Sequence, residues 1–182
     1  IAAIAGLAFA ALSGYYWILT DPSIAYLSSR SGAHWIKISE PFQIKMRDPE
    51  DLRILLRKRF TAGPLSTGDI SWKALGKAQV SLDGKILASI ESPQSWKTLQ
   101  HAVLPPLDAG AHEISVSVIN SQGPAALWLS SKALDVSTDR DWETSADEIV
   151  WAQAIRIDDR QPADISKMFG TTRAAVLHCF PV

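Results

Sequence analysis

The feature that most constrains this chain is a change in character near residue 20. Residues 1 to 20 carry no charged side chain, whereas much of the following sequence alternates apolar and polar residues between turns. An α-helix rises about 1.5 Å per residue, so the first segment would span roughly 30 Å, the thickness of a bilayer's hydrocarbon core. This order predicts a membrane or export segment that places a β-domain outside the cytoplasm, in the periplasm or the extracellular space.

The first segment has two interpretations. Tyr15, Tyr16 and Trp17 favour a transmembrane helix, because amphipathic rings prefer the headgroup layer, and Asp21-Pro22 would end that helix in a polar setting. The A-x-A pattern at 8–10 and the modest hydrophobicity of alanine favour a cleaved signal peptide instead. Both interpretations predict export of the residues that follow.

The two ends of the sequence indicate a piece of a larger envelope protein, since it begins without an initiator methionine and stops within an apolar run at 174–182. We expect residues 1–20 to be the transmembrane helix or signal segment, 21–160 one domain, and 161–182 a linker or the start of a further segment. Small residues at every fourth position of the first segment would let another helix approach closely. Other domains or helices of a larger membrane protein are therefore expected partners, besides the membrane itself.

Composition excludes several classes of function. Cys179 is the only cysteine, so an internal disulfide is impossible. The formal net charge of -1 lacks the surplus of Lys and Arg that phosphate binding requires, so no nucleic acid is expected as a partner. The histidines show no metal-ligand spacing and no G-x-S-x-G elbow is present, so we expect no catalytic residues and no enzyme activity within this chain.

Hydrophobic periodicity predicts an all-β fold. Period-two alternation or apolar runs mark strands at 35–38, 42–46, 52–60, 78–87, 114–118, 127–129 and 149–157. Asp83-Gly84 predicts a type I′ hairpin, because both residues tolerate positive φ. Short strands with frequent turn signals and little helical periodicity are typical of a β-sandwich.

Several motifs occur in one order within residues 35–157. They are Leu56-Arg57-Lys58-Arg59-Phe60, Val80-Ser81-Leu82-Asp83-Gly84-Lys85, the stretch from Leu107 to Val118, Thr138-Asp139-Arg140-Asp141-Trp142, and Trp151-Ala152. In this order they resemble the galactose-binding-like jelly-roll domains attached to bacterial glycoside hydrolases, such as α-L-rhamnosidases and β-galactosidase relatives. The resemblance implies a jelly-roll β-sandwich that acts as a noncatalytic accessory domain. Two positions depart from the group's pattern: Asp83 and His112 stand where asparagine is usual.

Three tryptophans are candidate ligand-binding residues, because an exposed indole ring can stack on a sugar face. Trp72 and Trp96 lie between serine and lysine, and we expect both in polar loops, unlike Trp128 and Trp151, which lie in apolar runs. Trp142 is surrounded by charged residues. The alternative for each is a structural place in the sandwich, which the resemblance favours for Trp142.

Two charged clusters have structural explanations beside functional ones. The basic run 57–59 would contact lipid phosphates or an acidic polysaccharide, or it is a solvated strand face with Arg57 and Arg59 on one side. We expect no cofactor and no metal site. The alternative is Ca²⁺ held by four aspartates without EF-hand spacing: Asp135, Asp139, Asp141 and Asp147.

These observations favour a noncatalytic, membrane-tethered, extracytoplasmic module that binds carbohydrate or a cell-envelope glycan for a larger envelope protein. One alternative is a structural or docking domain without a glycan ligand. Another is a periplasmic insertion in a multi-span glycosyltransferase whose chemistry lies elsewhere.

Overall fold

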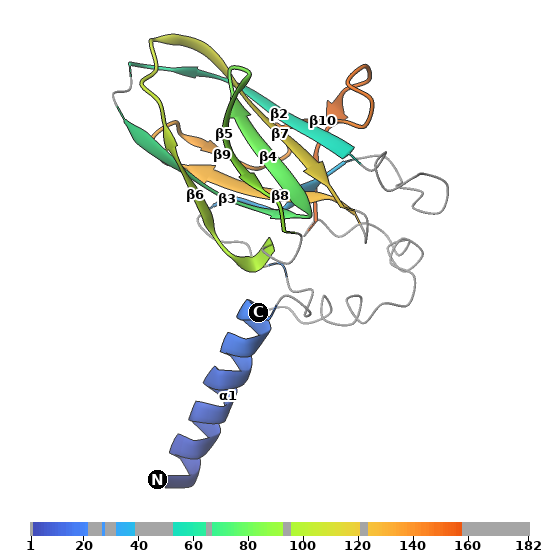
Figure 1. Cartoon of the computed structure of the whole chain (residues 1–182). Helices are drawn as coiled ribbons and strands as arrows, with labels where there is room; N and C mark the ends of the chain where they lie inside the picture. Colours follow the sequence, from blue (N-terminus) through green and yellow to red (C-terminus); the bar gives the residue numbers. More distant parts are fainter. Residues whose placement is uncertain are drawn as a thin grey trace.

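A single helix extends away from a body of β-strands (Figure 1). The computed structural model describes residues 2–21, 27, 32–38, 53–64, 67–92, 96–120 and 124–157. The expected strand at 42–46 and the expected segment 161–182 lie outside these residues.

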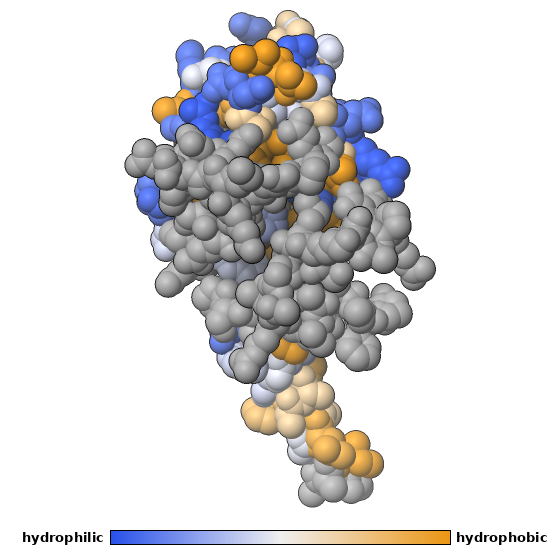
Figure 2. Space-filling model, turned by 90° about the vertical axis from the view of Figure 1, so that its right-hand side faces the viewer, coloured by the Kyte–Doolittle hydropathy of each residue, from blue (hydrophilic) through white to orange (hydrophobic). Residues whose placement is uncertain are grey.

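Helix α1 (Ala2–Thr20) covers the uncharged first segment. Most of its large side chains are exposed, and it forms the lower, largely apolar part of the molecule in Figure 2. At its end the Asp21 N–H donates to the Trp17 carbonyl at 2.9 Å, and the Lys97 ammonium donates to the Ile18 carbonyl. A cation at a helix C-terminus binds carbonyls that the helix leaves unpaired. Over the described ranges, no helix is both long and apolar enough to cross a membrane.

The strands form two antiparallel sheets. In the first sheet the order is β12-β1-β8-β3-β6, with β9 paired to β8, and in the second it is β11-β10-β2-β7-β4-β5. The first sheet contains β1 (Ile36–Lys37), β3 (Gly68–Leu75), β6 (Gln100–Leu104), β8 (Ala126–Ser131), β9 (Val136–Ser137) and β12 (Ile155–Arg156). The second contains β2 (Arg53–Ala62), β4 (Lys77–Leu82), β5 (Lys85–Ile90), β7 (Gly110–Ile119), β10 (Glu143–Ser145) and β11 (Ala152–Gln153).

The two sheets share one hydrophobic core, as in a β-sandwich. Alternation along β3 buries Ile70, Trp72 and Ala74, and alternation along β7 buries Val116 and its neighbours, all in one cluster of contacting side chains. Each fully buried aliphatic side chain stabilises the fold by about 1.5–3 kcal/mol. The predicted all-β fold is confirmed, whereas the jelly-roll connection pattern stays a prediction.

The β4–β5 hairpin is confirmed at the predicted residues. Asp83 and Gly84 connect the two strands with φ angles of 48° and 77°. Positive φ at both central residues is the signature of a type I′ turn, whose twist matches that of the flanking strands.

The expected last strand at 149–157 is wrong as a single element. Residues 152–153 pair in the second sheet and 155–156 in the first, and Ile149 is 82% exposed in a loop that projects beyond β10 (Figure 1). The Asp147 carboxylate accepts the N–H groups of Ile149 and Val150 at 2.9 Å each. These bonds hold a turn where apolar, β-branched residues had indicated a strand.

Candidate functional site

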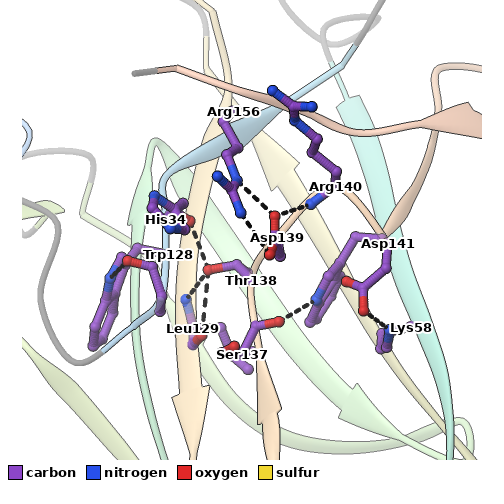
Figure 3. A network of polar contacts seen from close by, with 12 residues as sticks. His34, Lys58, Trp128, Leu129, Ser137, Thr138, Asp139, Arg140, Asp141 and Arg156 are labelled. Carbon is purple, nitrogen blue, oxygen red and sulfur yellow. Dashed lines mark hydrogen bonds and ion pairs between the residues drawn. The ribbon is translucent and has the colours of Figure 1, made fainter. Parts of the chain in front are cut away.

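Thr138 joins its own segment to those of His34 and Leu129 (Figure 3). Its hydroxyl donates to the His34 carbonyl at 2.7 Å and accepts the Leu129 N–H at 3.0 Å. The His34 N–H donates to the Thr138 carbonyl at 2.9 Å. Because Thr138 is fully buried, each lost bond would leave a buried polar group unsatisfied.

Trp142, a predicted ligand-binding residue, lies in the main core and is 0% exposed. Its indole N–H donates to the Ser137 carbonyl at 2.9 Å, and its own carbonyl accepts the Ala154 N–H at 2.8 Å. Its ring therefore closes the sandwich and presents no face to a ligand.

Charged residues of the stretch 138–142 form ion pairs (Figure 3). Asp139 accepts from Arg156 at 2.6 and 2.7 Å, and this pairing lowers the pKa of the Asp139 carboxyl to about 2. Asp141 pairs with Lys58, so two of the four aspartates considered for Ca²⁺ bind cationic side chains instead. In the part of the chain that the structure describes, no group of three His, Cys, Asp or Glu could hold a metal ion.

Trp72 does not lie in a loop as expected, and Trp96, which does lie between strands, is not exposed. Trp72 is 0% exposed inside β3, and its indole N–H is a buried donor without a partner among the described residues. Trp96 is 5% exposed and packs edge-on against Trp35, 6.5 Å between ring centroids, in a second cluster on the outer face of the first sheet. Serine and lysine neighbours indicated exposure of Trp72, yet alternation along β3 directs them outward and the ring inward. Neither ring presents a face on which a sugar could stack.

Asp83 and His112, the two residues that depart from the group's pattern, contact each other. His112 Nδ1 lies 2.7 Å from Asp83 Oδ2, and its Nε2 lies 3.0 Å from the Asp108 carbonyl oxygen. Both partners accept, so a ring protonated on both nitrogens fits this site. The hydrogen bonds that His112 donates to the Asp83 carboxylate and to the Asp108 carbonyl raise the pKa of His112. Partial burial alone would raise the pKa of the Asp83 carboxyl. The hydrogen bonds from the Glu113 N–H and from His112 outweigh burial, so this pKa is lowered overall.

The stability conferred by this pair is expected to depend on pH. The His112 contribution is full below its ordinary pKa of 6.5 and is lost as pH rises through the raised value. The Asp83 contribution is full above 3.8 and is lost as pH falls through the lowered value. We expect His112→Gln to lower the Tm most between pH 3.8 and 6.5, with a smaller effect at higher pH. Thermal unfolding monitored by circular dichroism measures this, and an equal loss in an Asp83→Asn background would contradict the pairing.

The outer face of the second sheet carries a row of polar side chains. Strand register places Glu143, Arg57, Ser115 and Ser81 side by side across four strands. A parallel row contains Leu55, Ser117, Gln79 and Ser89. Small hydroxyl side chains thus occupy the middle of the face, with larger charged groups at the β10 side.

Arg57 is the centre of the most organised cluster on this face. Its Nε donates to Glu143 Oε2 at 2.7 Å, and its guanidinium carbon lies 3.6 Å from the centroid of the Trp151 ring. The Trp151 N–H donates to the Glu148 carbonyl at 3.2 Å, which fixes the ring. Trp151 remains partly exposed. Cation–π stacking and a charge-assisted bond therefore hold an aromatic ring, a cation and a carboxylate together at the surface.

The basic run 57–59 is only partly the solvated strand face of one interpretation: the Arg59 side chain is 67% exposed, whereas those of Arg57 and Lys58 are 18% and 19% exposed. Arg57 and Arg59 lie on one side of β2 and bind Glu143 and Glu113, while Lys58 binds Asp141. Each cation already has a carboxylate partner, so the run does not form a free phosphate-binding patch.

Comparison with known proteins gives matches of structure only. No family model matches the sequence, and no curated protein matches it either. The structure is similar to α-L-rhamnosidase from Streptomyces avermitilis complexed with L-rhamnose, with a TM-score of 0.56 and 18% identity, covering 77% of this chain and 15% of that one. It is also similar to the Pleurotus ostreatus lectin in complex with GalNAc, with a TM-score of 0.55 and 18% identity, over 69% of this chain and 42% of the lectin.

A rhamnosidase from Bacillus sp. GL1 gives a TM-score of 0.54 at 14% identity, covering 71% of this chain and 19% of that one. In all three, the matched part is less than half of the known chain. At these identities the likeness is one of fold. The resemblance read from the motifs is confirmed as a likeness of fold: the described strands form a β-sandwich similar to those in the lectin and the rhamnosidases.

Proposed function

We propose that this chain is a noncatalytic carbohydrate-binding module of a larger protein, with its ligand on the outer face of the second sheet. The observation that carries the proposal is the surface cluster of Trp151, Arg57 and Glu143, which combines a fixed aromatic ring with charged hydrogen-bonding groups. Carbohydrate sites use this combination because a sugar has apolar C–H faces and a polar rim. The fold that this chain shares with a lectin and with rhamnosidases supports the same class of ligand.

A glycan array probed with the full chain tests this proposal. We expect reproducible binding that Trp151→Ala weakens at least tenfold, because truncation of an aromatic anchor commonly costs about 2 kcal/mol or more. Trp151 is partly exposed, so this variant should remain folded. Arg59→Gln is the matched control, since it changes a charged residue of the same strand away from the ring. Absence of binding by folded protein would refute the proposal.

A docking domain without a glycan ligand is the second candidate, and one observation favours it. Ile149 and Val150 are exposed at the tip of a loop that several hydrogen bonds hold in shape. A preordered apolar tip loses little conformational freedom when it enters a pocket on a neighbouring domain. A negative glycan array combined with tight binding to the rest of the protein would support this candidate.

We also propose that the chain is attached to a membrane and that its β-domain lies outside the cytoplasm. The uncharged α1 with its exposed apolar side chains favours attachment. Flotation of the full chain with lipid vesicles tests it. We expect flotation to be lost when residues 1–21 are removed, and a full chain that stays at the bottom of the gradient would refute attachment.

A further inference from the structure

The ion pair of Arg57 and Glu143 uses only part of each side chain. Arg57 donates through Nε to Glu143 Oε2, and within the described residues neither side chain makes another hydrogen bond or ion pair. The Glu143 side chain is 44% exposed and the Arg57 side chain 18% exposed, so the pair is partly open to solvent. The cluster therefore presents the two Nη groups of Arg57 beside the Oε1 atom of the Glu143 carboxylate.

The donors of Arg57 and the acceptor of Glu143 match two neighbouring hydroxyl groups of a sugar ring. Two neighbouring hydroxyls of a pyranose form a vicinal diol, in which each oxygen both donates and accepts. One hydroxyl can accept from Arg57 Nη while the other donates to Glu143 Oε1. The guanidinium is planar and fixed over the Trp151 ring at 3.6 Å, so its donors are held in position before a ligand arrives.

The charges of the surrounding face favour an uncharged sugar. Arg53 pairs with Glu148, Arg57 with Glu143 and Arg59 with Glu113. A carboxylate on the ligand would find no uncompensated cation among these arginines and would approach the exposed Glu143, a like charge.

Resting on the carbohydrate-binding function proposed above, we infer that Arg57 and Glu143 form a clamp for the vicinal diol of a neutral pyranose, next to the exposed part of Trp151. The clamp selects a neutral glycan over a uronate and requires free hydroxyls on adjacent carbons.

NMR titration of the full chain at millimolar ligand tests the clamp. The probes are the methyl glycosides of mannose, galactose and glucose, the same glycosides with the vicinal hydroxyls O-methylated, and the corresponding uronates. We expect the tightest neutral glycoside to lose about 10- to 100-fold in affinity with Glu143→Ala, because bonds to charged groups are worth about 1.5–3 kcal/mol. O-methylation should cause a similar loss, and the two losses should not add.

Glu113→Ala is the matched control, since Glu113 also pairs with an arginine of β2, at 3.1 Å, but beside no tryptophan. It should leave the affinity unchanged within about twofold, as expected for a pair outside the binding site. Equal affinities of the two alanine variants, or tighter binding of a uronate, would overturn the clamp and leave the carbohydrate-binding function standing. If no probe and no arrayed glycan binds the folded chain, the proposed function fails and the clamp with it.

Discussion

Replacement of Trp142 with alanine is expected to lower the free energy of unfolding by about 3–5 kcal/mol, the usual range for a buried Trp or Phe cut to alanine. The ring is fully buried in the core that the two sheets share. The substitution would leave a cavity and would also leave the Ser137 carbonyl, 2.9 Å from the indole N–H, without its donor. Equilibrium unfolding in urea, followed by far-UV circular dichroism, measures the change.

Two variants show whether the loss comes from burial. Trp142→Phe keeps most of the ring volume and removes the hydrogen bond, so it should cost clearly less than alanine. Trp151→Ala removes a partly exposed ring and should cost less again. Equal losses for the two alanine variants would contradict the placement of Trp142 in the core.

Gly76→Ala is expected to destabilise the fold by about 3 kcal/mol or more, because it adds backbone strain to a steric clash. Gly76 joins β3 to β4 with φ at +128°, and a Cβ there would lie 2.3 Å from the Ile119 carbonyl oxygen. Ile119 pairs with Lys77 at the start of β4, so relief of the clash would separate β4 from β7. The midpoint of urea unfolding reports this loss.

Two other glycines separate the causes. Gly63→Ala meets no atom within 4 Å and should change stability by less than about 0.5 kcal/mol. Gly110 has φ at +155° in open space, so Gly110→Ala tests backbone conformation without a clash. A Gly76→Ala protein as stable as the Gly63→Ala protein would show that the β3–β4 junction is not held as described.

Four strands of the second sheet, β2, β4, β5 and β7, were predictable because their pattern is local. Alternation along 52–60 and 114–118 corresponds to β2 and β7, and Asp83-Gly84 specified its hairpin. The β3 strand was missed although Ile70, Trp72 and Ala74 alternate with polar residues, because the preceding residues 62–69 resemble a loop. The signal was present and was outweighed by its Gly/Pro/Ser-rich neighbour.

The candidate site was not predictable from the sequence. Arg57 and Trp151 are distant in the chain, and only the pairing of β10 with β2 and β11 brings them together. Register between distant strands is set by the whole sheet and by the core, and a single sequence does not specify it. The motifs contained one signal for a different contact. Asp83 and His112, the two residues that depart from the group's pattern, lie against each other in space.

The bond from Lys97 to the end of α1 has a geometric consequence for access. Lys97 follows Trp96, which packs on the outer face of the first sheet, so the helix joins the sandwich on that side. Arg57 and Glu143 lie on the outer face of the opposite sheet. We therefore expect a partner held through α1 to meet the sandwich on the side of the first sheet and to leave the face that we propose for the ligand accessible.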